Sequence, residues 1–264
     1  MSGGHRARKR FGQNFLNDAN IIAHIIDVID PRAGDHMVEI GPGQAALTVK
    51  LLERLDRLDV IEIDRDLVAR LEDLRAQFPG LTIHSADALR FDYRQLQANE
   101  EPLRVVGNLP YNISTPLLFH LLEQAAIIRD MHFMLQKEVV ERMAAQPGGS
   151  DYGRLSIMVQ YRCQVDNLFR VPPTAFRPAP KVDSAIVRLI PHAELPYPAR
   201  DEQYFAKLVN HAFTQRRKTL RKSLKSYVAA ERMEAIGIDP MRRPETLSIA
   251  EFVALANIRA ENEH

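Results

Sequence analysis

From residue 37 onward the chain alternates short apolar runs with longer amphipathic segments, and this alternation restricts the possible folds more than any other feature. The order is strand 36–40, helix 45–55, strand 58–63, helix 66–78 and strand 81–86. It continues with strand 102–108, helix 114–125, strand 130–136, helix 137–145 and strands near 161–167 and 182–190. Strands that alternate with helices predict an α/β fold with a mainly parallel, doubly wound Rossmann-like sheet.

A proline-rich stretch at residues 190–200 separates this pattern from a C-terminal part that has only helical periodicity. We therefore predict two domains, an α/β domain over residues 1–192 and a smaller all-helical domain over residues 193–264. The first ten residues are basic and are predicted to form a mobile tail. A single cysteine, Cys163, excludes an internal disulfide, and the histidines show no paired metal-ligand spacing.

Glycines and acidic residues follow the first three predicted strands. Gly41 and Gly43 lie on the turn into the first helix, where the backbone can approach a ligand closely. Glu62, at the end of the second strand, is placed to accept hydrogen bonds from both ribose hydroxyls of a nucleoside, whereas Asp64 is expected to cap the next helix. Asp87, after the third strand, can accept from an adenine amino group or serve as a turn residue. These residues alone leave a nicotinamide cofactor open.

The segment GNLPYNIS follows the fourth strand and suggests amine chemistry. An exocyclic adenine amine is a poor nucleophile, and two hydrogen-bond acceptors can direct its lone pair at an electrophile. The Asn108 side-chain oxygen and the Leu109 carbonyl can form that pair, while Pro110 fixes the backbone and Tyr111 stacks on the base. The alternative is that the segment is only a turn into the next helix, and in either case Ser114 is expected to cap that helix, with Pro116 in its first turn.

Positive charge is concentrated although the net charge is only +1. Between residues 203 and 230 there is no acidic residue, and the basic residues are Lys207, Arg216, Arg217, Lys218, Arg221, Lys222 and Lys225. A second cluster is Arg6, Arg8, Lys9 and Arg10. Such clusters suit a phosphate backbone, and the alternative is a solvated helix face.

Several motifs together resemble one known family over nearly the whole chain. They are RKRFGQNFL, VEIGPG, VIEID, ADAL, GNLPYNIS, FMLQKEVVERM, YGRLSIMVQ, VPPTAFRPAPKVDSAIVRL and QRRKTLRKSL. The family is that of the small-subunit (16S) ribosomal RNA adenine N6,N6-dimethyltransferases, the KsgA family. The resemblance implies S-adenosyl-L-methionine as cofactor and two adjacent adenosines near the 3′ end of 16S rRNA, within the small (30S) ribosomal subunit, as acceptors. It also implies a role in ribosome biogenesis.

The resemblance also implies roles for individual residues. Donor contacts fall on Asn14, Leu16, Gly41, Glu62, Asp87 and Asn108. Tyr111 and Phe176 match the aromatic residues that hold a flipped adenine, and the segment GQNFL is expected to fold over the donor as a lid. Arg177 and Lys181, together with the basic residues 216–222, are expected to contact rRNA phosphates. We expect a cytoplasmic monomer with neither a metal ion nor a membrane segment.

Three alternatives remain open on the sequence. A related 23S rRNA methyltransferase that confers macrolide resistance shares the glycine turn and the N-L-P-Y turn. An assembly factor that binds the immature small subunit without needing catalysis is compatible with the basic helical part. A nicotinamide-dependent dehydrogenase shares only the glycine turn and the acidic residue.

Overall fold

The computed structural model describes residues 14–97 and 101–260, so the predicted basic tail lies outside the described residues. The chain forms two compact units. The first comprises residues 1–140 and 166–191, and the second comprises residues 141–165 and 192–264. The predicted boundary after residue 192 lies next to one of these divisions. Residues 141–165, which the prediction placed in the first domain, group with the second unit instead.

The first unit is built on a seven-stranded sheet with the strand order β4-β3-β2-β5-β6-β9-β7. The strands are β2 Met37–Ile40, β3 Leu58–Glu62, β4 Leu81–Ser85, β5 Leu103–Asn108, β6 Ile128–Gln136, β7 Cys163–Val171 and β9 Ser184–Pro191. The first five in this order are parallel, and β9 pairs antiparallel with β6. The predicted α/β fold is confirmed, with an antiparallel part added at one side of the sheet.

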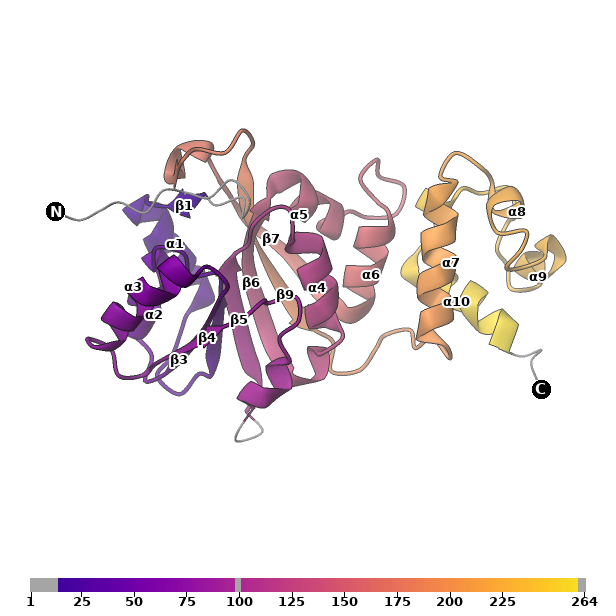
Figure 1. Cartoon of the computed structure of the whole chain (residues 1–264). Helices are drawn as coiled ribbons and strands as arrows, with labels where there is room; N and C mark the ends of the chain where they lie inside the picture. The colour runs from indigo at the N-terminus through magenta and orange to yellow at the C-terminus, as the bar shows by residue number, and fades with distance from the viewer. Residues whose placement is uncertain (1–13, 98–100, 261–264) are drawn as a thin grey trace. The chain divides into compact units, whose positions relative to one another are not determined.

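Helices lie alongside the sheet (Figure 1). Helices α2 Ala46–Leu52, α3 Arg65–Arg75 and α4 Ser114–Leu122 connect parallel strands, whereas α1 Ala19–Ile29 precedes β2 and the first half of α5 Lys137–Ala144 follows β6. Ile25 and Ile29 of α1 and Leu51 of α2 pack in one core with strand residues of the sheet. Burial of such side chains is worth about 1.5–3 kcal/mol each and fixes the helices on the sheet.

Polar residues lie at the starts of α3 and α4 and have different roles there. Asp64 caps α3 as predicted, since its side chain accepts from the Asp66 N–H at 3.1 Å. The predicted Ser114 cap is wrong, because Ser114 is the first residue of α4 and its hydroxyl donates to the Tyr111 carbonyl at 3.1 Å. Ser114 therefore closes the turn that contains Tyr111.

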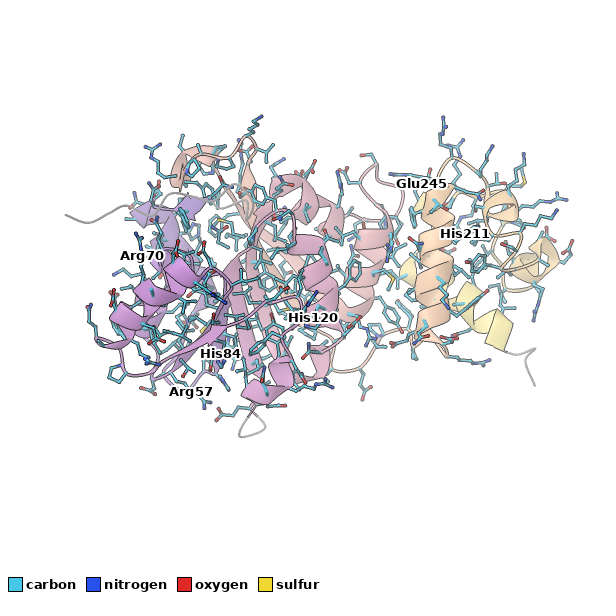
Figure 2. The ribbon with its side chains drawn as sticks, viewed as in Figure 1. Arg57, Arg70, His84, His120, His211 and Glu245 are labelled. Carbon is cyan, nitrogen blue, oxygen red and sulfur yellow. The ribbon has the colours of Figure 1, made fainter. Side chains whose placement is uncertain are left out.

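One partly buried carboxylate links three neighbouring strands of the sheet. Asp59 of β3 lies 3.1 Å from His36 Nε2, just before β2, and 2.7 Å from His84 Nε2 on β4. His84 is labelled in Figure 2. Burial raises the pKa of Asp59, but the hydrogen bonds and charges of His84 and His36 outweigh burial and hold this pKa below its usual value. These contacts fix the relative register of β2, β3 and β4, whose carboxyl ends form the candidate site.

Two short strands, β1 Phe15–Leu16 and β8 Phe176–Arg177, pair antiparallel beside the sheet. Leu16 lies opposite Phe176 in this ladder, and both side chains are buried. The pairing brings a segment near the start of the chain against one from the far end of the first unit. It holds residues 14–16 in place.

Gly107, the residue before Asn108, is required by close packing of β5 against β2. A Cβ atom at this position would lie 2.6 Å from the Ile40 carbonyl oxygen and 3.0 Å from the Leu109 side chain. We expect Gly107→Ala to lower the free energy of unfolding by about 1–3 kcal/mol. The added methyl group would collide with the Ile40 carbonyl, a backbone atom of β2 that cannot rotate away as a flexible side chain could. Denaturant unfolding measures this change. Gly34→Ala is the control, since no atom lies within 4 Å of its Cβ, and equal destabilisation of both variants would contradict the expectation.

The second unit is helical, as predicted for the C-terminal part. Its helices are α6 Arg154–Arg162, α7 Glu202–Thr214, α8 Leu220–Ser223, α9 Ala230–Ala235 and α10 Ile249–Ala260, together with the last half of α5. Ser248 and Glu251 form a capping box at the start of α10, with hydrogen bonds of 2.7 and 3.2 Å. The predicted strand near residue 161 begins only at Cys163, because α6 continues to Arg162 and Tyr161 of this helix is buried in the helical core.

The basic segment does not continue α7 as a helix. Helix α7 ends at Thr214, and residues 215–219 form a turn before the short α8. Leu220 and Leu224 are fully buried and return the chain to the core of the unit. Arg217, Lys218, Arg221 and Lys222 are exposed on this turn and on α8.

Within residues 14–97 and 101–260, no helix combines the length and apolar character needed to cross a membrane. The same residues contain no group of three or more histidine, cysteine or acidic side chains placed to hold a metal ion.

Candidate active site

A cavity of about 250 Å³ opens at the carboxyl ends of β2, β3, β4 and β5. Parallel strands of an open sheet bring their carboxyl ends to one edge, where ligands of this fold bind. The cavity brings together ten predicted residues, namely Asn14, Leu16, Gly41, Gly43, Glu62, Asp87, Asn108, Leu109, Pro110 and Tyr111. Residues that are up to 97 positions apart in the sequence thus form one site.

The glycine turn after β2 combines positive φ angles with a close contact. Gly41 has φ 64° and Gly43 has φ 58°, a region that residues with a Cβ rarely adopt. A Cβ on Gly43 would also lie 3.2 and 3.3 Å from two ring atoms of Phe15. Phe15 lines the cavity, so Gly43 allows the segment 14–16 to approach the turn.

Glu62, at the end of β3, is held by backbone N–H groups. Its Oε1 atom accepts from Ile63 and Asp64 at 2.9 Å each, and Oε2 accepts from Gly43 at 3.4 Å. Burial raises the pKa of Glu62, while the three backbone hydrogen bonds oppose this rise. The carboxylate is only 6% exposed and is fixed on the wall of the cavity, where it can accept from neighbouring ribose hydroxyls.

Glu39, in the middle of β2, is a cavity residue that sequence reasoning missed. Its side chain is 2% exposed, and Oε2 has no hydrogen-bond partner among the described residues. Burial raises the pKa of Glu39 to about 7, and the negative charge of Glu62 adds to this rise. A buried acceptor without a partner is costly, so the site is suited to a ligand that carries a cationic or donor group. The signal was an acidic residue inside an apolar strand directly before the glycine turn.

We expect the unfolding free energy of ligand-free Glu39→Gln to increase relative to that of the parent protein as pH rises from 4.5 to 8. A carboxyl group whose pKa is raised on folding stabilises the protein fully below the unfolded value of 4.5, and this contribution is lost as pH rises to about 7. The difference in unfolding free energy should therefore change by up to roughly 3 kcal/mol between these pH values. Denaturant unfolding at pH 4.5, 6 and 8 measures it. Glu72→Gln, on the exposed face of α3, is the control, and parallel profiles for parent and Glu39→Gln would contradict the expectation.

Asp87, after β4, has the turn role considered from the sequence, and it also lines the cavity. Its Oδ1 atom accepts from the Leu89 N–H at 3.0 Å, which orders the turn. The cavity is also lined by Ile63, whose apolar side chain is 51% exposed. An exposed apolar side chain and a carboxylate in one cavity suit the face and the amino edge of an adenine.

The turn after β5 orients Asn108 and Tyr111. Asn108 Nδ2 donates to the Asn14 carbonyl at 3.1 Å, which leaves Oδ1 as the end of the amide that can accept. The Leu109 N–H donates to the Met134 carbonyl at 3.2 Å, and this fixes the backbone on β6. Tyr111 lines the cavity, and burial raises the pKa of its phenol. The phenol is therefore neutral at physiological pH.

Phe176 differs from its predicted place, because the structure does not bring it to the cavity. Its side chain is 1% exposed and packs in the core with Leu16, Ala175 and Ile186. Side chains alternate along a strand, so the inward ring of Phe176 leaves its neighbour Arg177 exposed. Arg177 and Lys181 are exposed as phosphate contacts require, but neither lines the cavity.

The residues of the cavity fit a nucleoside that carries an amino-acid group. Glu62 can hold a ribose, Asp87 and Ile63 can hold an adenine, and the buried acceptor of Glu39 can face a cationic amine. Asn108, at the other side of the cavity, presents an acceptor to a second molecule. A glycine turn on a parallel sheet, followed by this amide at the fourth strand end, defines a Rossmann-like methyltransferase that acts on an exocyclic amine.

Comparison with known proteins places the chain within this class. The model of the ribosomal RNA adenine dimethylase family matches residues 4–261. The chain belongs to this family. The resemblance inferred from the motifs is thereby confirmed, as are the enzyme class and S-adenosylmethionine as the cofactor of the family's methyl transfer.

Curated relatives and solved structures agree with this membership. The ribosomal RNA small subunit methyltransferase A of Alcanivorax borkumensis is 61% identical over 96% of this chain and 90% of its own length. The protein of the same name from Pseudomonas aeruginosa is 60% identical over 97% and 96%. A dimethyladenosine transferase from Plasmodium falciparum has a TM-score of 0.80 at 26% identity, covering 94% of this chain and 98% of that one. The 23S rRNA methyltransferase ErmE has a TM-score of 0.72 at 27% identity, covering 92% and 98%.

Proposed function

We propose that this protein transfers methyl groups from S-adenosylmethionine to N6 of two adjacent adenosines near the 3′ end of 16S rRNA, and that it does so within the small (30S) subunit. The observation that carries the proposal is the orientation of Asn108, whose Nδ2 is bonded to the Asn14 carbonyl so that Oδ1 is available as an acceptor. The names of relatives about 60% identical over nearly the whole chain support a small-subunit substrate.

Different residues of the cavity have different roles in methyl transfer. When bound, S-adenosylmethionine supplies an electrophilic methyl group on a sulfonium centre. Asn108 Oδ1 and the Leu109 carbonyl accept from the two N–H groups of the adenine amine and direct its lone pair at that methyl. Tyr111 stacks on the base and holds it out of the RNA stack. The alkylated nitrogen is acidic and loses its proton to water, so positioning and exclusion of bulk water supply the acceleration.

Glu62 and Asp87 are assigned to the donor rather than to the acceptor. Both side chains lie on the strand ends β3 and β4, on the glycine-turn side of Asn108. Glu62 holds the ribose, and Asp87 accepts from the adenine amine of the donor. Gly41, Gly43, Asn14 and Leu16 shape the wall around it.

Mapping of the methylated nucleotide is the test of this proposal. Undermethylated 30S particles and naked 16S rRNA are incubated with labelled donor, and the labelled positions are mapped. We expect two adjacent dimethyladenosines near the 3′ end in 30S particles. Large-subunit particles are included because the chain is also structurally similar to the 23S rRNA methyltransferase ErmE, so 23S rRNA is the alternative acceptor to test. Label confined to 23S rRNA would refute the small-subunit proposal.

We further propose that the exposed basic residues of the second unit hold rRNA phosphates. Arg217, Lys218, Arg221 and Lys222 are exposed on one turn and a short helix. Arg216 is different, because its guanidinium donates to the carbonyls of Gly149 and Ser150 and so stabilises the unit itself. A monomer that acts in the cytoplasm completes the proposal, since docking on a large particle does not require self-association.

We expect Arg217→Ala combined with Lys218→Ala to weaken binding to 30S particles and to reduce its salt dependence. Each lost phosphate contact should lower the slope of log K against log salt by roughly 0.7–0.9. Filter binding between 50 and 300 mM salt measures the slope, and calorimetry should show unchanged donor affinity. Lys50→Ala combined with Arg75→Ala is the control, because these exposed residues of the first unit pair with Glu53 and Glu72. A parental salt slope in the first variant would contradict the assignment.

A further inference from the structure

A hydrogen bond between two hydroxyl groups anchors the aromatic ring of the candidate site. The Tyr111 phenol oxygen lies 2.7 Å from Ser184 Oγ. Tyr111 lines the cavity, whereas Ser184 does not. The ring is therefore held by its polar end from outside the cavity.

Ser184 is itself rigidly placed. It is the first residue of β9, pairs with Gln136 of β6 in the antiparallel ladder, and is 0% exposed. The preceding residue, Asp183, accepts from the Lys137 N–H at 2.9 Å. A hydroxyl on such a strand has little freedom, so it fixes the position of whatever it bonds.

Tyr111 has contacts at both ends as a result. Its carbonyl accepts from the Ser114 hydroxyl at 3.1 Å, which closes the turn, and its phenol is bonded to Ser184. A tyrosine side chain has two rotatable bonds, and fixing its far end restricts both. The ring plane is thus set before a base arrives, which lowers the entropy lost on stacking.

We propose that Ser184 is a positioning residue for methyl transfer, because its buried hydroxyl holds the Tyr111 ring in the plane that receives the target adenine. The inference rests on the proposed role of Tyr111 in stacking. It also accounts for a tyrosine rather than a phenylalanine at this position, since stacking alone requires no hydroxyl.

The test compares Ser184→Ala, Tyr111→Phe and the double variant on undermethylated 30S particles. Each single change removes the same hydrogen bond, so each should lower kcat/KM for the particle by roughly 2- to 10-fold, the worth of one such bond. The double variant should be no worse than the more impaired single variant, since the bond can be lost only once. Donor affinity measured by calorimetry should stay at the parental value in all three.

A structural role alone would give a different result. Ser156→Ala is the matched control, because Ser156 is also 0% exposed and its hydroxyl bonds the Arg142 carbonyl and the Gly153 N–H in the second unit. We expect it to lower the melting temperature while leaving kcat/KM unchanged. Parental kinetics of Ser184→Ala, or losses that add in the double variant, would overturn the inference.

Failure of the inference can be told apart from failure of the proposed function by Tyr111→Ala. If Tyr111→Ala loses activity while both Ser184→Ala and Tyr111→Phe retain it, the ring matters and the anchor does not. If Tyr111→Ala is fully active, the stacking role itself is wrong and the inference falls with it. If Ser184→Ala folds poorly, Tyr111→Phe still tests the bond from its half-buried end.

Discussion

Replacing Asn108 by alanine should lower the rate of methyl transfer to 30S particles by about 10²- to 10³-fold, the range seen when one preorganised hydrogen-bond group is removed from an active site. The reason is geometric. The Asn108 amide is held by the Asn14 carbonyl, and the alanine variant has no acceptor at that point of the cavity. Single-turnover assays with saturating donor measure the chemical step directly.

Asn108→Asp is the informative companion to this variant. It keeps an acceptor oxygen but replaces the Nδ2 donor, so an anionic oxygen would face the Asn14 carbonyl. We expect partial activity that falls as the introduced carboxylate ionises. Alanine and aspartate variants that both keep the parental rate would refute the role of the amide.

Replacing Glu62 by alanine should weaken donor binding by about 10- to 100-fold, because the ribose loses a charged acceptor worth roughly 1.5–3 kcal/mol. The change also leaves the N–H groups of Ile63 and Asp64 without their acceptor. Calorimetric titration with S-adenosylhomocysteine, which does not react, measures the loss.

Glu62→Gln separates these two effects. Glutamine retains one acceptor oxygen for the backbone N–H groups but carries no charge, so donor affinity should be intermediate while the melting temperature stays close to parental. Unchanged affinity in Glu62→Ala would show that the ribose is bound elsewhere.

Much of the site could be predicted because its residues occupy strand ends. Glu62, Asp87 and Asn108 each follow an apolar run, and the strands of a parallel sheet end at one edge, so local patterns sufficed to bring them together. Gly41 and Gly43 were recognisable as a pair of glycines on the turn from a strand into a helix, and both have the positive φ angles that favour glycine. The strand and helix order of the first unit followed from the same periodicity.

Other features depend on contacts that no local pattern records. Phe176 is buried through pairing of β8 with β1, segments 160 residues apart in the sequence. Glu39 lies in an apolar strand. From the sequence alone, its side chain could point either to solvent or into the cavity, and only the assembled sheet shows which. Residues 141–165 join the second unit because Tyr152 and Ile157 pack with its helices.

The bond from Asn108 to the main chain of residue 14 ties the direction of this amide to the position of segment 14–16. If that segment leaves the glycine turn, the amide loses the partner that fixes its Nδ2 atom and is free to rotate. In the proposed function, donor binding against segment 14–16 would therefore also set the direction in which the Asn108 oxygen points.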